Sequence, residues 1–475
     1  MSGFKMAWEA AFLAVFFIVA GTVALSTSLN DLDSNLHLDY VREIQNVRSV
    51  PRYHPRVFNT AGVQIPFPYP VGYHLTMAIF PHRVTLYKLL QVLFAVSCLI
   101  LILKLAGLLG VKRRFYALIP FVLTSPFSRF SITPHPDLLA LLFSLLSAYF
   151  MLRYLQGGGK IHAAAAVLAG FYGGLVREFA LITLLFFSLA LSLKYRGKLH
   201  QIGACLISIL LLTLLGYYWM NCLIKGQNLL YPFFGREDPK ASDWYLSHVS
   251  FWSILRYAPA QALGELLGVF SLFLPMFLLV KPRDTILASV FGCQIVLTFL
   301  FLPSTGGLDR YVMFALPFMA IAYANVWERL PKGVPVVLLL AGMFALYPLQ
   351  GYALEKKLPK DFEEIAENLG PGDHVLFREY GQLAYRTGCR ANWTSLFWSS
   401  DLFESFERVD RVEDLIRKHG VTHVLIDKEL ILQAGSPMIG NEAMGYPMEW
   451  VKKVENMGVK MGETSRYLLY RVGGP

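Results

Sequence analysis

The chain has 475 residues, of which 55% are hydrophobic and only 16% are charged, and its mean hydropathy is +0.46. These values exclude an ordinary soluble enzyme of this length and indicate a polytopic α-helical membrane protein. The net charge of +10 lies in residues 1–350, with 27 Lys and Arg against 14 Asp and Glu, whereas residues 351–475 hold 16 against 19. Basic loops beside membrane spans explain that excess, so nucleic-acid binding is not inferred. The five cysteines are scattered, which predicts neither a disulfide framework nor a zinc site.

Apolar runs predict about eleven transmembrane helices. The first run, 8–28, is close to the ~20 residues that a helix needs to cross the hydrocarbon core. It has no small-residue cleavage site before Leu29, so we interpret it as a retained span. The other predicted spans are 84–108, 115–130, 137–155, 162–177, 179–195, 201–221, 258–280, 285–303, 311–327 and 333–350.

Lys and Arg predict the orientation of these spans, because cytoplasmic loops collect them. Lys5 places the N-terminus in the cytoplasm, and five later loops with basic residues then fall on the same side: 112–114, 153–160, 194–198, 281–283 and 329–332. The first loop (29–80) and the chain after residue 350 fall on the outer side. The membrane would be the plasma membrane in a prokaryote and the endoplasmic reticulum in a eukaryote.

The turn between the predicted fifth and sixth spans is only Arg177–Glu178. Isolated charges in hydrocarbon are costly, so we expect this pair at the outer surface or in a wet cavity. If the pair were instead buried inside one long helix, the orientation of every later span would be reversed.

Residues 351–475 have the mixed composition of a small extracytoplasmic α/β domain. Strands are predicted at 374–377, 422–427 and 466–472, and a helix at 400–420. The segment has no Gly-rich phosphate loop and no metal-ligand spacing. We therefore expect it to support the transmembrane domain (1–350), by packing over the loops or binding the acceptor.

The most polar stretch beside the spans is the first loop, which holds three Asp, three His and four Arg between residues 29 and 74. Asp31 and Asp33 come directly after the first span. Chemistry on a lipid-linked substrate would take place in such a loop, so these two carboxylates are the first catalytic candidates.

Several segments together carry a family resemblance. They are the acidic start of the first loop, PYPVGYH (68–74), PHPDLLALLFSLLSAYF (134–150), GGLVREFALITLLFF (173–187), NLLYPFFG (228–235) and DRYVMFALPF (309–318). In order and spacing the chain resembles the GT-C superfamily of membrane glycosyltransferases, especially the polyprenyl-phosphate-sugar-dependent enzymes akin to protein mannosyltransferases and lipid A sugar transferases. The resemblance covers nearly the whole chain.

This resemblance implies transfer of a sugar from a polyprenyl phosphate to a hydroxyl of a lipid, glycan or protein acceptor, at the outer face and with inversion at the anomeric carbon. The family's acidic motif is commonly Asp-Glu. An ungapped alignment ending at residues 41–43 places that aspartate on Asp33 and puts Ser34 where the glutamate would be. The chain thus departs from the pair and offers Asp31 and Asp33, either of which could act.

A hydroxyl becomes a good nucleophile when a carboxylate takes its proton. Asp33 is the first candidate for this general base and Asp31 is the second. We expect the pKa of the base to rise, because it is partly desolvated and lies near a second carboxylate. In the alternative interpretation both are solvated acids, or one caps a helix that begins near Asn35. The Asp-x-Asp spacing can also hold a divalent cation such as Mg²⁺ or Mn²⁺, which the sequence leaves open.

A phosphate leaving group needs positive charge. Arg177 is the first candidate, because the resembling enzymes carry Arg or Lys beside Glu at this place, although it could simply pair with Glu178. Arg310, beside Tyr311, is the second, although Asp309 could neutralise it.

Two residues that open the fourth predicted span are further candidates. His135 could bind substrate, and Asp137 could orient the acceptor or share the role of base. A carboxylate at a helix N-terminus beside Pro136 is also favoured without any function.

Histidines and aromatic residues of the outer loops are candidates for sugar or prenyl contacts. His37, His54 and His74 could bind sugar hydroxyls, and Tyr69 and Tyr231 could stack on a sugar. Interfacial placement is the simpler interpretation of most of them.

Two other classes of function share these features. A transporter or flippase of lipid-linked sugars would also have many spans, but it commonly has internal repeats and polar segments at mid-membrane, which this sequence lacks. A glycan polymerase or ligase would have similar outer loops, so only substrate assays would distinguish it.

Overall fold

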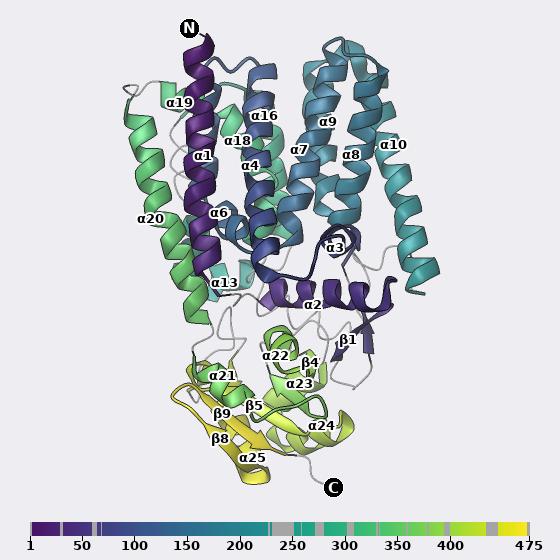
Figure 1. Cartoon of the computed structure of the whole chain (residues 1–475), viewed down its shortest axis with the longest axis vertical. Helices are drawn as coiled ribbons and strands as arrows, with labels where there is room; N and C mark the ends of the chain where they lie inside the picture. Colours follow the sequence, from purple (N-terminus) through teal and green to yellow (C-terminus); the bar gives the residue numbers. More distant parts are fainter. Residues whose placement is uncertain are drawn as a thin grey trace.

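The computed structural model describes residues 2–28, 32–58, 64–67, 69–226, 229, 251–257, 259–270, 280–301, 308–328, 331, 333–357, 360–377, 380–393, 400–433 and 445–472. A bundle of long helices forms one part of the molecule, and a mixed sheet with short helices forms another at one end of the bundle (Figure 1). Helices α2 and α3 lie between the two parts.

Five helices among the described residues are long and apolar enough to cross a membrane. They are α1 (Ser2–Ser26), α4 (Val84–Leu108), α7 (Pro136–Leu155), α10 (Leu199–Tyr217) with its π-helical continuation η3 (Tyr218–Ile224), and α20 (Gly333–Lys357). Shorter apolar helices α8 (Lys160–Val176), α9 (Phe179–Lys194) and α16 (Thr285–Phe301) accompany them. The predicted span 258–280 contains α14 (Pro259–Phe270), and residues 271–279 lie outside the described ranges.

Two predicted spans are not continuous helices. The run 115–130 is divided into two helical segments. The first is a 3₁₀ turn followed by α5 (Leu118–Val122), the second is α6 (Ser125–Ile132), and the chain bends by 81° between them. The run 311–327 is divided into α17 (Leu308–Val312), α18 (Leu316–Ala322) and α19 (Asn325–Glu328). Pro126 and Pro317 lie at the second positions of α6 and α18, where the missing backbone N–H costs no intrahelical hydrogen bond, so each proline suits the start of a new helix. The prediction of about eleven spans is therefore not confirmed in number by the described residues.

Helix α2 (Leu32–Val47) lies across the end of the bundle (Figure 1). Leu36, Tyr40 and Ile44 repeat every four residues and so share one face of the helix. They form a buried cluster with Phe67 and Val71 of the first loop and with Tyr217 and Met220 at the end of α10. This apolar face fixes α2 against the bundle, although the helix is polar overall.

Helix α3 (Gly72–Ala78) packs against the end of α8. A Cβ atom on Gly72 would lie 2.7 Å from the carbonyl oxygen of Leu175, a distance that real Cβ atoms do not reach. The Tyr172 hydroxyl donates a hydrogen bond to the Gly72 carbonyl at 3.1 Å. Glycine at this position lets the first loop pass directly over the α8–α9 turn.

The sheet at the end of the bundle combines two distant parts of the chain. Its strand order is β2-β1-β4-β3-β5-β9-β8. Strands β1 (Tyr53–Phe58) and β2 (Gln64–Pro66) come from the first loop, and β1 pairs in parallel with β4 (Arg390–Trp393). Strands β3 (His374–Phe377), β5 (His423–Asp427), β8 (Val459–Glu463) and β9 (Tyr467–Arg471) complete it.

Short helices cover this sheet: α21 (Asp361–Ala366), α22 (Tyr380–Thr387), α23 (Ser400–Glu407), α24 (Val412–Lys418) and α25 (Met448–Met457). The predicted helix 400–420 is thus two helices joined by a 3₁₀ turn. One apolar cluster surrounds Trp450 and another surrounds Phe362. The predicted strands near 374, 422 and 466 are β3, β5 and β9.

The loops with basic residues gather at the end of the bundle that holds the N-terminus, opposite the sheet (Figure 1). Arg114 binds Glu9 of α1 at 2.8 Å, and Arg283 donates to the Gly110 carbonyl. Lys194 binds Asp284 at 2.9 Å, which adds a further loop. Residues 329, 330 and 332 lie outside the described ranges.

Candidate functional site

Asp33 lies in the first turn of α2, where the helix begins beside the end of α1. Its Oδ2 atom is 2.5 Å from Nη1 of Arg310 on α17 and 3.6 Å from Nε2 of His135. Asp33 remains partly accessible, with 29% of its side chain exposed. Three segments that are distant in the sequence thus meet at one carboxylate.

A buried chain of charged groups leads away from Asp33. His135 Nδ1 is 2.9 Å from Asp137 Oδ2, and Asp137 Oδ1 is 3.0 Å from Nε of Arg177. Glu178 lies farther from the same Nε atom, at 3.8 Å. The main partner of Arg177 is therefore Asp137 and not the adjacent glutamate.

Local structure explains why these groups converge. Helix α7 begins at Pro136, and the carboxylate in its first turn is favoured by the helix dipole. Arg177 occupies the tight turn between α8 and α9, whose separation confirms the predicted turn at Arg177–Glu178. Because α7 and α8 pack closely together, their adjacent ends bring Asp137 and Arg177 into contact.

Aromatic rings border both guanidinium groups. Arg177 lies 4.8 Å from the centroid of the Tyr69 ring, and its Nη2 donates to the Tyr311 hydroxyl at 3.4 Å. Arg310 lies 5.1 Å from the Tyr311 ring, which stacks on Phe179 at 4.0 Å. Guanidinium groups are attracted to such ring faces, so the rings orient both cations.

Two buried histidines lie beside this network. His37 Nδ1 is 2.9 Å from His74 Nε2, and the His37 ring is edge-on to the His135 ring at 5.4 Å. Burial, followed by the charges of His74 and His135, lowers the pKa of His37 well below its ordinary value of 6.5. His37 is therefore neutral near pH 7, so it adds hydrogen-bonding capacity and no charge.

The expected rise in the pKa of Asp33 was wrong. Burial does raise this pKa, but the charge of Arg310 and the hydrogen bond and charge of His135 outweigh burial, so the pKa lies well below 3.8. For His135, burial lowers the pKa but the two neighbouring carboxylates raise it above 6.5. Sequence reasoning paired Asp33 with a second carboxylate, whereas the fold brings cations to it.

Several predicted site residues are not tested by this geometry. Asp31 and Tyr231 lie outside the described residues, as do the side chains of His54 and Asp309. Within the described part of the chain, no three His, Cys, Asp or Glu residues are grouped so that they could hold a metal ion. A cation site that uses Asp31 therefore stays a prediction.

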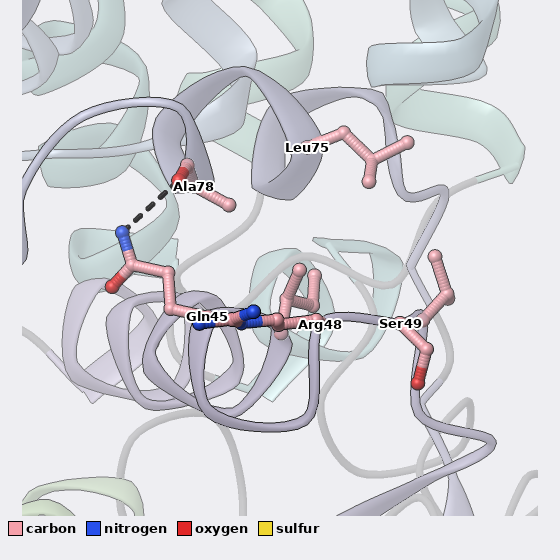
Figure 2. Close-up of a pocket in the computed structure, with 7 residues that line it drawn as sticks. Gln45, Arg48, Ser49, Leu75 and Ala78 are labelled. Atoms are coloured by element: carbon pink, nitrogen blue, oxygen red, sulfur yellow. Dashed lines mark hydrogen bonds between the residues drawn. The ribbon is translucent and has the colours of Figure 1, made fainter.

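The other end of α2 borders a separate cavity of about 350 Å³, lined by Ile44, Gln45, Arg48, Ser49, Val50, Leu75 and Ala78. Gln45 donates a hydrogen bond to the carbonyl of Ala78 at 3.1 Å, which ties α2 to α3 (Figure 2). It also donates to the carbonyl of Phe80 at 2.6 Å. None of the predicted site residues lines this cavity.

Two residues beside the site were not predicted from the sequence. Phe179 supports Tyr311, and Lys225, at the end of η3, donates to the main chain of the first loop. A lysine followed by glycine at the end of an apolar run is ordinary for a membrane span, so no sequence pattern distinguishes Lys225.

Solved structures with the same architecture were found by comparison of the folds. ArnT from Cupriavidus metallidurans, bound to undecaprenyl phosphate, has a TM-score of 0.60 and 13% identity over 99% of each chain. The Archaeoglobus fulgidus oligosaccharyltransferase has a TM-score of 0.58 and 11% identity over 100% of this chain and 75% of its own. The arabinofuranosyltransferase AftD from Mycobacteria has a TM-score of 0.52 and 14% identity over 99% of this chain and 41% of its own.

All three are GT-C membrane glycosyltransferases. The chain has the GT-C fold. No protein-family model matches the sequence, and no curated protein matches it by sequence. The resemblance seen in the sequence is thus confirmed at the level of the fold.

Proposed function

We propose that this protein is an inverting glycosyltransferase that moves a sugar from a polyprenyl-phosphate donor to an acceptor hydroxyl, at the membrane face that carries the C-terminal domain. The GT-C fold supports a transferase, and the undecaprenyl phosphate bound to ArnT supports a polyprenyl-phosphate donor. The observation that carries the proposal is one accessible carboxylate, Asp33, which contacts the guanidinium of Arg310 directly. Through His135 and Asp137, the same carboxylate is linked to the second guanidinium, that of Arg177.

Asp33 is the proposed general base. The acceptor oxygen attacks the anomeric carbon and loses its proton to Asp33, while the bond from the anomeric carbon to the phosphate oxygen breaks. The products are the glycosylated acceptor and the polyprenyl phosphate. In this scheme Asp31 is the alternative base, and Asp137 acts by holding His135 and Arg177.

Arg310 and Arg177 are the proposed phosphate ligands. The Nη1 atom of Arg177 is buried and has no hydrogen-bond partner among the described residues, so it can still donate to an anion. A donor phosphate at Arg310 would compete with Asp33 for the same guanidinium. Loss of that pairing raises the pKa of Asp33 toward its ordinary value and makes it a stronger base when the donor is bound.

The first test is transfer by purified protein from undecaprenyl-phosphate mannose, glucose or arabinose, radiolabelled in the sugar, to a membrane extract. Asp33→Asn keeps the shape of the side chain but removes the base, so we expect transfer to fall by about 10²–10⁴-fold. Asp31→Asn is assayed in parallel. If transfer falls further in Asp31→Asn than in Asp33→Asn, the base is Asp31.

The matched control is Asp410→Asn, a substitution at a side chain that is 68% exposed in the C-terminal part, and we expect unchanged transfer. Full activity in both Asp33→Asn and Asp31→Asn would remove the acidic motif from the mechanism. Movement of an intact lipid-linked sugar across vesicles, without transfer, would instead support the flippase interpretation. Transfer of whole glycans would support a polymerase or ligase.

A further inference from the structure

The end of α10 reaches the site through a buried lysine. Lys225 follows the π-helical segment η3, and its side chain is fully buried. Its Nζ atom donates to the carbonyl oxygens of Phe67, at 2.8 Å, and Tyr69, at 2.9 Å. A π-helical turn within an apolar span is uncommon and often occurs at functional sites, because it redirects the side chains that follow.

Other side chains from the same helix end also bind main-chain groups around the site. Met220 Sδ accepts a hydrogen bond from the Val71 amide at 3.4 Å, and the Tyr217 hydroxyl donates to the Gly174 carbonyl at 2.8 Å. Gly174 precedes Arg177 by three residues. The end of α10 is therefore hydrogen-bonded both to the first loop and to the end of α8.

The main chain held by Lys225 carries the ring that faces Arg177. Tyr69 lies 4.8 Å from the Arg177 guanidinium and 4.7 Å from the His37 ring, and Phe67 stacks on Tyr40 at 3.9 Å. A shift of the Phe67 or Tyr69 carbonyl would move these rings with it. Lys225 does not contact Arg177 itself, and any influence that it has on Arg177 is transmitted by Tyr69.

The chemistry of Lys225 suits this role. Burial lowers its pKa to about 7, which favours the neutral amine relative to an exposed lysine. A neutral amine has two N–H groups, which match the two carbonyl acceptors. Both hydrogen-bond partners of the Nζ atom are main-chain carbonyls, and the same atom lies 5.9 Å from the centroid of the Phe67 ring.

We propose that Lys225 is a positioning residue, which fixes the main chain of Phe67 and Tyr69 so that the Tyr69 ring orients Arg177 toward the donor phosphate. The identity of that phosphate rests on the proposed function. The coupling of Lys225 to Arg177 through Tyr69 rests on the contacts alone, so the two can fail separately.

The test is a double-mutant cycle on full-length protein in lipid nanodiscs, with undecaprenyl phosphate as the probe. Lys225→Met removes the N–H donors and Tyr69→Leu removes the ring, and we expect each to weaken binding on the order of tenfold. In the Tyr69→Leu background, Lys225→Met should have almost no further effect. Equal effects of Lys225→Met in both backgrounds would show that it does not act through Tyr69 and would overturn the proposal.

Hydrogen exchange gives a readout that does not depend on any activity. Lys225→Met should speed exchange of amides in 64–74 and leave those in α4 as in the wild type. Unchanged exchange in 64–74 would also overturn the proposal. If this variant does not fold, Lys225→Gln, which keeps an NH₂ group on a shorter side chain, is judged by the same two outcomes.

Arg177→Gln separates the two proposals. Tight binding of undecaprenyl phosphate by this variant would contradict the proposed function, and exchange in 64–74 would still decide the role of Lys225. Loss of binding in Arg177→Gln, together with a non-additive cycle, supports both.

Discussion

At the scale of single residues, the site is a set of charges that compensate one another. In the order of their contacts, Arg310, Asp33, His135, Asp137 and Arg177 alternate in sign, and three of the five are almost fully buried. Buried charges are tolerated when each has a partner, and removal of one partner leaves the other uncompensated. Substitutions here will therefore affect folding and function differently, according to which charge they remove.

Substitutions of Arg177 separate the role of its planar guanidinium from the role of its positive charge. Arg177→Lys keeps a cation for Asp137 but loses the planar fork and the stacking on Tyr69, so we expect stable protein with transfer reduced at least about tenfold. Arg177→Met leaves Asp137 buried without a cation, and we expect it to lose about 3–5 kcal/mol of stability. Radiolabel transfer and thermal melting measure the two effects. Wild-type transfer in Arg177→Lys would show that the fork does not matter.

His135 predicts a pH dependence of stability. Its folded pKa is raised, so its contribution is fully present below the unfolded value of 6.5 and is lost as the pH rises through the folded pKa. The melting temperature of the wild type should exceed that of His135→Gln by more at about pH 6 than at about pH 9. A difference that does not change with pH would mean that His135 is neutral in the folded protein.

The contribution of Asp33 to stability depends on pH in the opposite direction from that of His135. Its folded pKa is depressed, so its contribution to stability is present above the unfolded value of 3.8 and is lost as the pH falls through the folded pKa. Asp33 is therefore ionised at physiological pH in the protein without a bound ligand. Occupation of Arg310 by another anion would raise the pKa of Asp33 and make it a stronger base.

At the scale of elements, helix ends position the site. Helix α2 supplies Asp33, α7 supplies Asp137, the α8–α9 turn supplies Arg177 and α17 supplies Arg310. Much of this was predictable, since apolar length alone predicted α4 at 84–108 and the first turn of α7 near 137. The breaks at Pro126 and Pro317 were not anticipated, because both runs are continuous in hydropathy.

The contact between α3 and α8 can be tested at Gly72. Gly72→Ala places a Cβ 2.7 Å from a backbone oxygen that cannot rotate away, so α3 must move. We expect a loss of about 1–3 kcal/mol in stability and reduced transfer. Gly203→Ala in α10 is the matched control, because nothing lies within 4 Å of its Cβ, and it should be neutral or slightly stabilising. Equal melting temperatures for both variants would contradict this close contact.

At the scale of the whole molecule, the C-terminal part is joined to the first loop and to helix α2, which carries Asp33. The connections are a shared sheet and helix α22. Strands β1 and β4 pair in parallel, and Tyr385 of α22 contacts the guanidinium of Arg42 on α2, at 5.0 Å from the ring centroid. The Tyr385 hydroxyl also lies 3.5 Å from His82 Nε2. The helix that carries Asp33 is therefore held from both sides.

Loss of the Tyr385 ring should loosen this docking. We expect Tyr385→Ala to speed hydrogen exchange in α2 and β1 and to reduce transfer severalfold, whereas Tyr385→Phe keeps the ring over Arg42 and should resemble the wild type. The same exchange in α2 for Tyr385→Ala and wild type would show that α22 does not restrain the site helix.

The membrane class, the long apolar helices, the side on which the basic loops lie and the acidic start of the first loop could all be predicted without coordinates, because hydropathy and charge placement are local properties of the chain. The pairing of Asp33 with Arg310, the pairing of Arg177 with Asp137 and the joining of first-loop strands to the C-terminal sheet became visible only in the folded chain. These contacts join residues far apart in sequence, and a pKa depends on which charges surround it. That is why the expected direction of the Asp33 pKa was reversed by its actual neighbours.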